Sequence, residues 1–293
     1  MSAGVRVGVV LHVLEDQPWC LRLMQDLQGL LAHRADIHLE VSDGAADAER
    51  QLHLVEAHLA ARVDVLMVLP IDSERLKPVL RGYREAGIPV IVLDNEVDDP
   101  SLYRSLIVAD NRHFGRKMGE FFLEVTGGRA ELLELQGIAS TSAARDRGQG
   151  FREALAGQPG VRIVESVTGD WLAERAREQV AAALPRHPGL DGVYAQNDEM
   201  ARGAWDAAAA AGRADELLIT GIDALRGEHG LGLVMQGRLA ATMINPSPAG
   251  AAAEALLAIL RGEAPLKKTL LQTSLLRSNE RVREWQRARR RSA

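Results

Sequence analysis

Short acid and amide side chains follow four of the strands that the sequence predicts. They come after the apolar runs 88–93, 190–195, 216–222 and 239–244, as Asp94-Asn95, Asn197-Asp198, Asp223 and Asn245. In an open parallel sheet, ligands bind beyond the carboxyl ends of the strands. A carboxylate accepts two hydroxyl protons, and a carboxamide both donates and accepts. The pattern predicts a site for a polyhydroxylated small molecule. Capping of the next helix is the alternative role for each position.

Two tryptophans and one arginine fit the same site. Trp19 and Trp171 both fall where a predicted strand leads into a helix, and an aromatic face there can stack on the apolar face of a sugar ring. Arg147, near the start of the predicted helix 143–156, offers five fixed donors to oxygen atoms. The alternatives are packing for the tryptophans and an exposed helix position for the arginine. Trp205 and Trp285 are predicted to pack.

The sequence offers little support for catalysis. It contains no P-loop, no G-x-S-x-G, no H-E-x-x-H and no G-x-G-x-x-G. The eight histidines share no metal-ligand spacing, and Cys20 is predicted to be a partly buried thiol. We therefore predict no catalytic residue, no metal and no cofactor. A glycosidase-like pair formed by Asp94 and Asp223 is the enzymatic alternative.

Charge and hydropathy limit the partners. The 293 residues carry a net charge of −5, which argues against a nucleic-acid surface. The basic run Arg287–Arg291 is predicted to be a solvated helix end, with a helical DNA contact as the alternative. No apolar run reaches the roughly 20 residues of a membrane helix. Val5–Leu11 is predicted to be a core strand rather than an export signal, so a cytoplasmic protein and a secreted protein without its signal both stay open.

Strand and helix patterns alternate along the chain. Residues 5–11, 37–41 and 66–69 have strand patterns like the four runs above, and Cys20–Leu31 and Phe114–Val125 have helical spacing. Further strands are predicted at 130–135, 161–167 and 270–276, and further helices at 143–156, 171–184, 198–211, 228–236 and 248–261. Regular alternation of this kind indicates parallel sheets covered by helices. Eleven or twelve strands exceed one compact open sheet, so we predict an α/β fold of two doubly wound parallel-sheet lobes.

The chain resembles the ribose-type periplasmic sugar-binding proteins of ABC importers over nearly its whole length. The stretches that carry the resemblance are Glu134–Phe151, Ala195–Ala204, Gly87–Val90, Val108–Asn111, Gly221–Asp223 and Gly237–Thr242.

The resemblance implies the type I periplasmic binding protein fold, in which two lobes joined by three crossover segments close like a hinge around the ligand. It implies an N-terminal lobe of residues 1–109 plus 246–272 and a C-terminal lobe of residues 110–245 plus 273–293. The implied ligand contacts, together with Asn95 from the strand-end pattern, are Gln17, Trp19, Asp94, Asn95, Arg147, Trp171, Asn197, Asp223 and Asn245. The implied partners are a sugar or polyol and the membrane permease subunits of an ABC importer. We expect a periplasmic monomer that binds no nucleic acid.

Several positions depart from a ribose binder. The family has Asp-Arg where this chain has Asp94-Asn95, and a second aromatic residue where it has Cys20. It has phenylalanine and glutamine where this chain has Trp171 and Asn245. The implied contacts in the second lobe are similar to those of glucose- and galactose-type relatives; they are Trp171, Asn197, Asp223 and Asn245. A hexose, a cyclitol or a linear polyol therefore remain open as ligands. The alternative function is a sugar-sensing effector domain like that of LacI-type repressors, without its DNA-binding segment, or the sensor of a receptor.

Overall fold

The computed structural model describes residues 4–14 and 17–292. Within these residues the chain divides into two compact units. The first unit holds the described residues up to Ala109, with Ser140–Ser142 and Pro246–Gln272. The second unit holds Asp110–Ala139, Ala143–Asn245 and the described residues from Thr273 onward. Each unit has its own six-stranded sheet, and nine of the ten strand pairs in the two sheets follow the parallel pattern that the βαβ alternation predicted.

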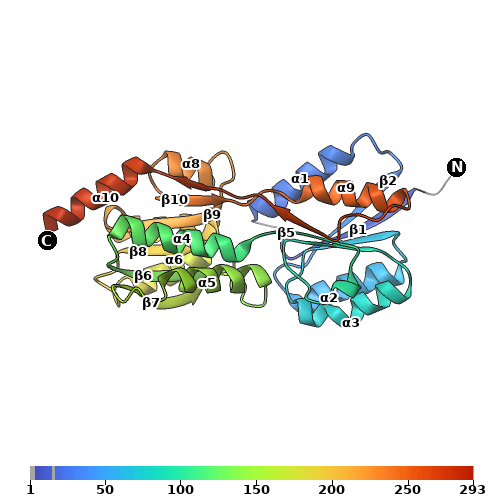
Figure 1. The fold of residues 1–293 in the computed structure, drawn as a ribbon, viewed down its shortest axis with the longest axis horizontal. Helices are drawn as coiled ribbons and strands as arrows, with labels where there is room; N and C mark the ends of the chain where they lie inside the picture. Colours follow the sequence, from blue (N-terminus) through green and yellow to red (C-terminus); the bar gives the residue numbers. More distant parts are fainter. Residues whose placement is uncertain (1–3, 15–16, 293) are drawn as a thin grey trace. The chain divides into compact units, whose positions relative to one another are not determined.

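The first unit has a fully parallel sheet in the order β11-β5-β4-β3-β1-β2. Figure 1 shows α1 and α9 on one face of this sheet and α2 and α3 on the other. Strands β3 and β4 are buried along their whole length, as expected for strands covered on both faces. The elements are β1 (Val5–Leu11), α1 (Pro18–Leu31), β2 (Ile37–Asp43), α2 (Ala48–Ala60), β3 (Val65–Val68), α3 (Ser73–Glu85), β4 (Val90–Leu93), η1 (Pro100–Leu102), β5 (Ser105–Ala109), α9 (Ala249–Leu260) and β11 (Lys268–Leu271).

The second unit has the sheet order β12-β10-β9-β8-β6-β7. Its helices α6 and α7 pack closely against each other, and its core is rich in alanine, with larger side chains such as Leu133, Val193 and Ile219. The elements are α4 (Asn111–Thr126), β6 (Ala130–Gln136), α5 (Ser142–Leu155), β7 (Val161–Thr168), α6 (Ala173–Ala183), β8 (Gly192–Ala195), α7 (Asp198–Ala210), η2 (Ala214–Glu216), β9 (Leu218–Asp223), α8 (Gly230–Met235), β10 (Ala241–Ile244), β12 (Leu275–Arg277) and α10 (Asn279–Ser292).

The predicted strand 270–276 is wrong. The structure has two strands there, β11 in the first sheet and β12 in the second, because the chain changes unit at Gln272 and Thr273. Strand β12 also runs antiparallel to β10, which departs from the all-parallel prediction. A continuous apolar pattern cannot reveal that its two halves belong to different sheets.

The sequence patterns predicted no helix at the positions of α2 and α3 and no strand at the position of β5. Helix α3 contains Pro78 in its interior, a residue that normally ends a helix, and its exposed face is densely charged. The basic run near the C-terminus does lie on a helix, α10, where Arg287, Arg289 and Arg290 are exposed. Trp285 of α10 is buried and donates its indole N–H to the Glu216 carbonyl oxygen (2.8 Å), which confirms its predicted packing role.

No helix in the part of the chain that the structure describes is long and apolar enough to span a lipid bilayer.

Candidate ligand-binding site

Strand β4 delivers Asp94 and Asn95 to the carboxyl edge of the first sheet. Asp94 has a positive φ of 57°, a left-handed conformation that Asp and Asn tolerate better than most residues. Its backbone N–H donates to the Ile107 carbonyl oxygen of β5 (2.8 Å), which holds the turn. Asn95 donates from Nδ2 to the Pro70 carbonyl oxygen (2.7 Å), so its amide ties the ends of β3 and β4 together. Asp94 is largely buried at this edge, with 8% of the residue exposed.

Gln17 and Trp19 lie at the start of α1, which follows β1 after a loop. Gln17 is the N-cap residue, Pro18 is the first helical residue, and Trp19 therefore lies in the first turn of the helix rather than in the loop before it. Both side chains are more than 90% buried. Strands β1 and β4 are separated in the sheet by β3 alone, so the loop that leads from β1 to these residues and the turn at Asp94 leave the same carboxyl edge of the first sheet. The Cys20 thiol is also buried, with its Sγ 3.7 Å from His12 Nδ1.

Arg147 of α5 is held at the carboxyl edge of the second sheet. Its Nε donates to Asn111 Oδ1 (2.8 Å) and its Nη1 to the Gln196 carbonyl oxygen (2.5 Å). Its guanidinium lies 5.4 Å from the ring centroid of Trp171, at cation–π distance. Arg147 is only 3% exposed, so the alternative of an exposed helix arginine is wrong.

Trp171 follows β7 in a turn in which it and Asp170 both have positive φ, 68° and 49°. The predicted helix 171–184 therefore begins two residues late, at Ala173. The indole ring lies directly on the backbone of Gly137, since a β-carbon built there would overlap it. No sequence pattern singled out Gly137, although it lies within the stretch 134–151 that carries the family resemblance.

Asn197 performs the capping role that was the alternative to ligand binding. Its Oδ1 accepts from the Met200 backbone N–H (2.8 Å) at the start of α7, and its Nδ2 donates to the Trp171 carbonyl oxygen (3.1 Å). A carboxamide has two N–H groups and two lone pairs, so each atom keeps capacity for one further bond. The cap therefore fixes the side chain without excluding a ligand contact.

Asp223 and Asn245 form a bonded pair. Asp223 ends β9, Asn245 follows β10, and Asn245 Nδ2 donates to Asp223 Oδ1 (3.2 Å). Both residues are buried, at 8% and 5% exposure. An acceptor and a donor in contact on neighbouring strands match two adjacent hydroxyl groups, each of which both donates and accepts. The second unit thus brings together two linked groups, Arg147 with Trp171 and Asn197, and Asp223 with Asn245.

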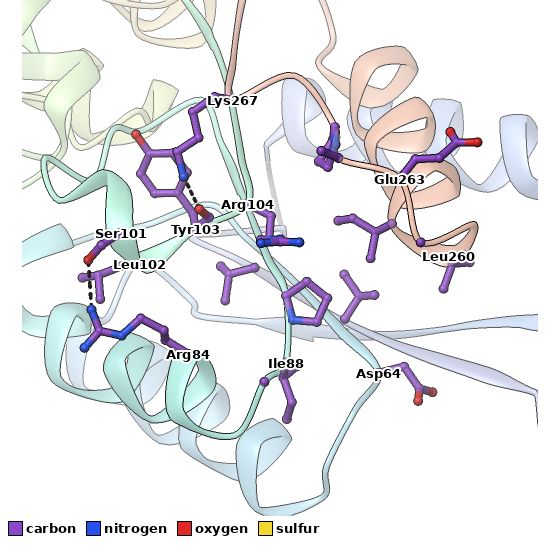
Figure 2. A pocket seen from close by; sticks show the side chains of 18 of the residues that line it. Asp64, Arg84, Ile88, Ser101, Leu102, Tyr103, Arg104, Leu260, Glu263 and Lys267 are labelled. Carbon is purple, nitrogen blue, oxygen red and sulfur yellow. Dashed lines mark hydrogen bonds between the residues drawn. The ribbon is translucent and has the colours of Figure 1, made fainter.

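A cavity of about 1010 Å³ in the first unit lies away from these residues (Figure 2). It is lined by the amino ends of β3, β4 and β5 and by the ends of α3 and α9. Its charged side chains include Arg84, which donates to Ser101 Oγ (3.0 Å), and Lys267, which donates to the Tyr103 carbonyl oxygen. The candidate residues of this unit lie at the carboxyl ends of the same parallel strands, so this cavity is at the opposite edge of the sheet.

The described residues contain no group of three or more His, Cys, Asp or Glu side chains that could hold a metal ion.

Two doubly wound α/β units, each with acid, amide and aromatic side chains at the carboxyl edge of its sheet, form a protein of the small-molecule binding class. The chain matches the family model described as a periplasmic binding protein domain over residues 7–264. It belongs to the periplasmic binding protein family.

The relatives refine this assignment. The chain is 32% identical to the galactofuranose-binding protein YtfQ of Escherichia coli K12, with 83% of this chain and 79% of the relative covered. It is 33% identical to the ribose import binding protein RbsB of Salmonella typhimurium, covering 79% and 77%. Among solved structures, it superposes on the fructose-binding periplasmic domain of a hybrid two-component system with a TM-score of 0.89 at 28% identity, covering 98% and 95%.

These comparisons confirm the predicted resemblance to ribose-type periplasmic proteins and the predicted fold class. They also confirm that the chain is a substrate-binding protein rather than an enzyme, and they place its family in the periplasm. The assignment of single residues to the ligand remains a prediction.

Proposed function

We propose that the protein captures a monosaccharide, or a related polyol or cyclitol, by hinge closure and delivers it to the membrane permease of an ABC importer. The two units are the lobes, with boundaries at 1–109 plus 246–272 and 110–245 plus 273–293. The proposed contacts are Gln17, Trp19, Asp94 and Asn95 in the first lobe and Arg147, Trp171, Asn197, Asp223 and Asn245 in the second. A ligand that bonds to both lobes favours the closed form by its differential affinity for that form.

The bonded pair of Asp223 and Asn245 carries this proposal. A buried carboxylate beside a carboxamide recognises neighbouring hydroxyls, and it would bind a phosphate poorly because the carboxylate repels an anion. Asp94 presents a second carboxylate in the other lobe. Trp171, with its ring on the backbone of Gly137 and 5.4 Å from the Arg147 guanidinium, adds an aromatic surface to the second lobe. Acid, amide and aromatic surface together suit a neutral ring that carries several hydroxyl groups.

A thermal-shift screen tests the ligand class. D-ribose, D-galactose and D-fructose represent the sugars named for the three relatives, and myo-inositol represents the cyclitols. A compound that binds only the folded protein raises the melting temperature, by an amount that grows with the logarithm of its concentration above Kd. We expect at least one of these compounds to do so, and glucose 6-phosphate, as an anionic control, to have no effect. A panel without any shift would contradict the proposal.

Asp94→Ala and Asp223→Ala test the assignment of residues in both lobes. Each variant removes a hydroxyl acceptor in a buried site, so we expect each to weaken binding by about 2–3 kcal/mol, roughly 30-fold to 150-fold. Isothermal titration calorimetry with the best sugar from the screen measures this. Asp206→Ala, on the half-exposed part of α7, is the control and should bind as wild type does. If either Asp94→Ala or Asp223→Ala binds the sugar normally, that lobe's contacts are assigned wrongly.

A sensory role is the second candidate. It is favoured by the superposition on the fructose-binding periplasmic domain of a hybrid two-component system. Sensing and transport need the same sugar site and differ in the membrane partner. Deletion of the gene distinguishes them: loss of uptake of the bound sugar supports transport, whereas loss of sugar-induced transcription with normal uptake supports sensing. We further propose that the protein is a monomer and binds no nucleic acid, which sedimentation and a DNA retention assay would check.

A further inference from the structure

The buried carboxylate of Asp198 lies behind the proposed sugar contacts of the second unit. Asp198 is the first residue of α7, directly after the N-cap residue Asn197, and it is 2% exposed. Its Oδ2 accepts from the Ala224 backbone N–H (2.7 Å), and its Oδ1 accepts from Thr242 Oγ1 (2.7 Å). Ala224 follows Asp223, and Thr242 lies on β10 three residues before Asn245. One carboxylate thus links the segment after β8 to the residue that follows β9 and to β10 itself.

The backbone that Asp198 holds is strained. Asp223 and Ala224 have φ angles of 133° and 52°, in a region that side-chain-bearing residues rarely adopt. Such conformations persist where the surroundings impose them. The hydrogen bond from Ala224 to Asp198 is one such constraint, and it acts at the residue next to the proposed sugar acceptor Asp223.

Two glycines make room for the carboxylate. A β-carbon built on Gly221 of β9 or on Gly230 of α8 would overlap the oxygens of Asp198. The carboxylate is therefore enclosed by β9, β10 and α8 and has little freedom to move.

We propose that Asp198 is a positioning residue that fixes the direction of Asp223 and the strand leading to Asn245, and thereby sets sugar affinity without touching the sugar. This inference rests on the proposed function. The ionised form of Asp198 accepts both hydrogen bonds at full strength, because charge-assisted bonds are stronger than neutral ones. Protonation of Asp198 weakens the bond that holds Ala224, so sugar affinity should depend on pH.

The charges around Asp198 place this dependence near neutral pH. Desolvation by burial raises the pKa of Asp198 to about 7; the bonds from Thr242 and Ala224 oppose the shift, Glu199 adds to it, and Arg147 of α5 opposes it. Glu199 is itself paired with Arg202 on α7 and with His229 at the start of α8. Asp223, the residue before Ala224, is a further titratable group beside these contacts.

Asp198→Asn separates positioning from packing. The amide has the same shape and can accept from Ala224 and donate to Thr242, so it imitates the protonated acid at every pH. We expect calorimetry with D-ribose, D-galactose and D-fructose to give an affinity about tenfold weaker than wild type at pH 8, for whichever sugar binds. At pH 6 the wild-type affinity should approach that of the variant. Asp206→Asn, an acid on the same helix away from these contacts, should keep the wild-type affinity at both pH values.

Equal affinity of Asp198→Asn and wild type at pH 8, or a deficit of the same size at pH 6 and pH 8, would overturn the proposal. The backbone amide of Ala224 supplies a second measurement that needs no sugar. Its proton chemical shift should titrate near pH 7 in the wild type and not in Asp198→Asn. An Ala224 amide shift that is the same in the wild type and in Asp198→Asn at every pH from 5 to 9 would show that the carboxylate does not hold this amide, and it would refute the positioning role even if none of the three sugars binds. Failure of all three sugars alone contradicts the proposed function instead.

Discussion

The position of the Trp171 ring depends on Gly137, which has no side chain. Its ring occupies the space above Gly137, and its backbone is held in a left-handed turn that Asn197 supports through the Trp171 carbonyl oxygen. Gly137 in turn donates its N–H to Gln196 Oε1 (3.0 Å), and the Gln196 backbone accepts from Arg147. The aromatic face and the arginine are therefore positioned by one small network.

Gly137→Ala should disturb this network. The added methyl group would overlap the indole, so we expect Trp171 to shift and the affinity for the bound sugar to fall about tenfold or more. Calorimetry measures the affinity, and a crystal structure of the variant would show the displaced ring. An unchanged affinity would mean that Trp171 makes no essential contact with the sugar.

The sequence predicted these residues better than it predicted their roles. Apolar runs that end in polar residues predicted Asp94, Asn197, Asp223 and Asn245 at strand ends, and the structure has them there, with Asp223 as the last residue of β9. The function of Asn197 as a cap was foreseen only as an alternative. The supports provided by Gly137 and Gln196 could not be predicted, because they depend on contacts between segments that are distant in the sequence.

At the scale of elements, the packing of α6 against α7 positions Trp171 and the residue that bonds to its carbonyl oxygen, Asn197. Trp171 precedes α6 and Asn197 precedes α7. The two helices approach closely at Gly203, where a β-carbon would overlap the Ala173 carbonyl oxygen. This close approach explains why a residue with poor helix propensity occurs in the middle of α7.

Gly203→Ala should push the two helices apart. We expect a loss of about 1–3 kcal/mol in the free energy of unfolding, measured by urea denaturation, with a parallel loss of sugar affinity. Gly29→Ala in α1 is the matched control, because no atom lies within 4 Å of the added carbon. It should stabilise the protein by about 0.5–1 kcal/mol, since alanine favours a helix more than glycine does. If both substitutions changed the free energy of unfolding in the same direction, close packing at Gly203 would not explain the effect.

Helix and strand prediction was limited by the same non-local effects. Strands β3, β4 and β8 are short, buried and clearly marked in the sequence. Helix α3 contains Pro78, which removes one backbone donor, yet it forms because Leu76, Leu80 and Tyr83 are buried on one face. The separation of β11 from β12 depends on which sheet each strand joins, and no local pattern contains that information.

At the scale of the whole molecule, Asp198 gives the stability a distinctive pH dependence. Its folded pKa of about 7 exceeds its ordinary value of 3.8, so the folded state holds the proton more tightly than the unfolded state. The resulting stabilisation is complete below about pH 4 and is lost as the pH rises through 7. His58 acts in the opposite direction, because burial lowers its pKa and its unfolded form takes up protons first as the pH falls.

The difference between Asp198→Asn and wild type isolates this contribution. We expect the variant to gain stability relative to wild type as the pH rises from 5 to 8, measured by urea denaturation at each pH. Asp36, whose pKa is lowered to about 2 by Arg34, should not contribute in this window because it is ionised in both states. A constant difference across the window would show that Asp198 does not titrate there. Under the expected outcome, the ionised carboxylate that favours sugar binding does so at a cost in stability.

The positions of the four tryptophans allow sugar binding to be measured by intrinsic fluorescence. Trp19 is the only one in the first unit, and Trp171 is the only one in the second unit that belongs to the proposed sugar contacts. Trp205 and Trp285 pack beside the guanidinium groups of Arg281 and Arg289 on α10. With those two replaced by phenylalanine, intrinsic fluorescence would come from Trp19 and Trp171 alone. Each lobe would then carry a single emitter, and sugar binding could be followed without any attached dye.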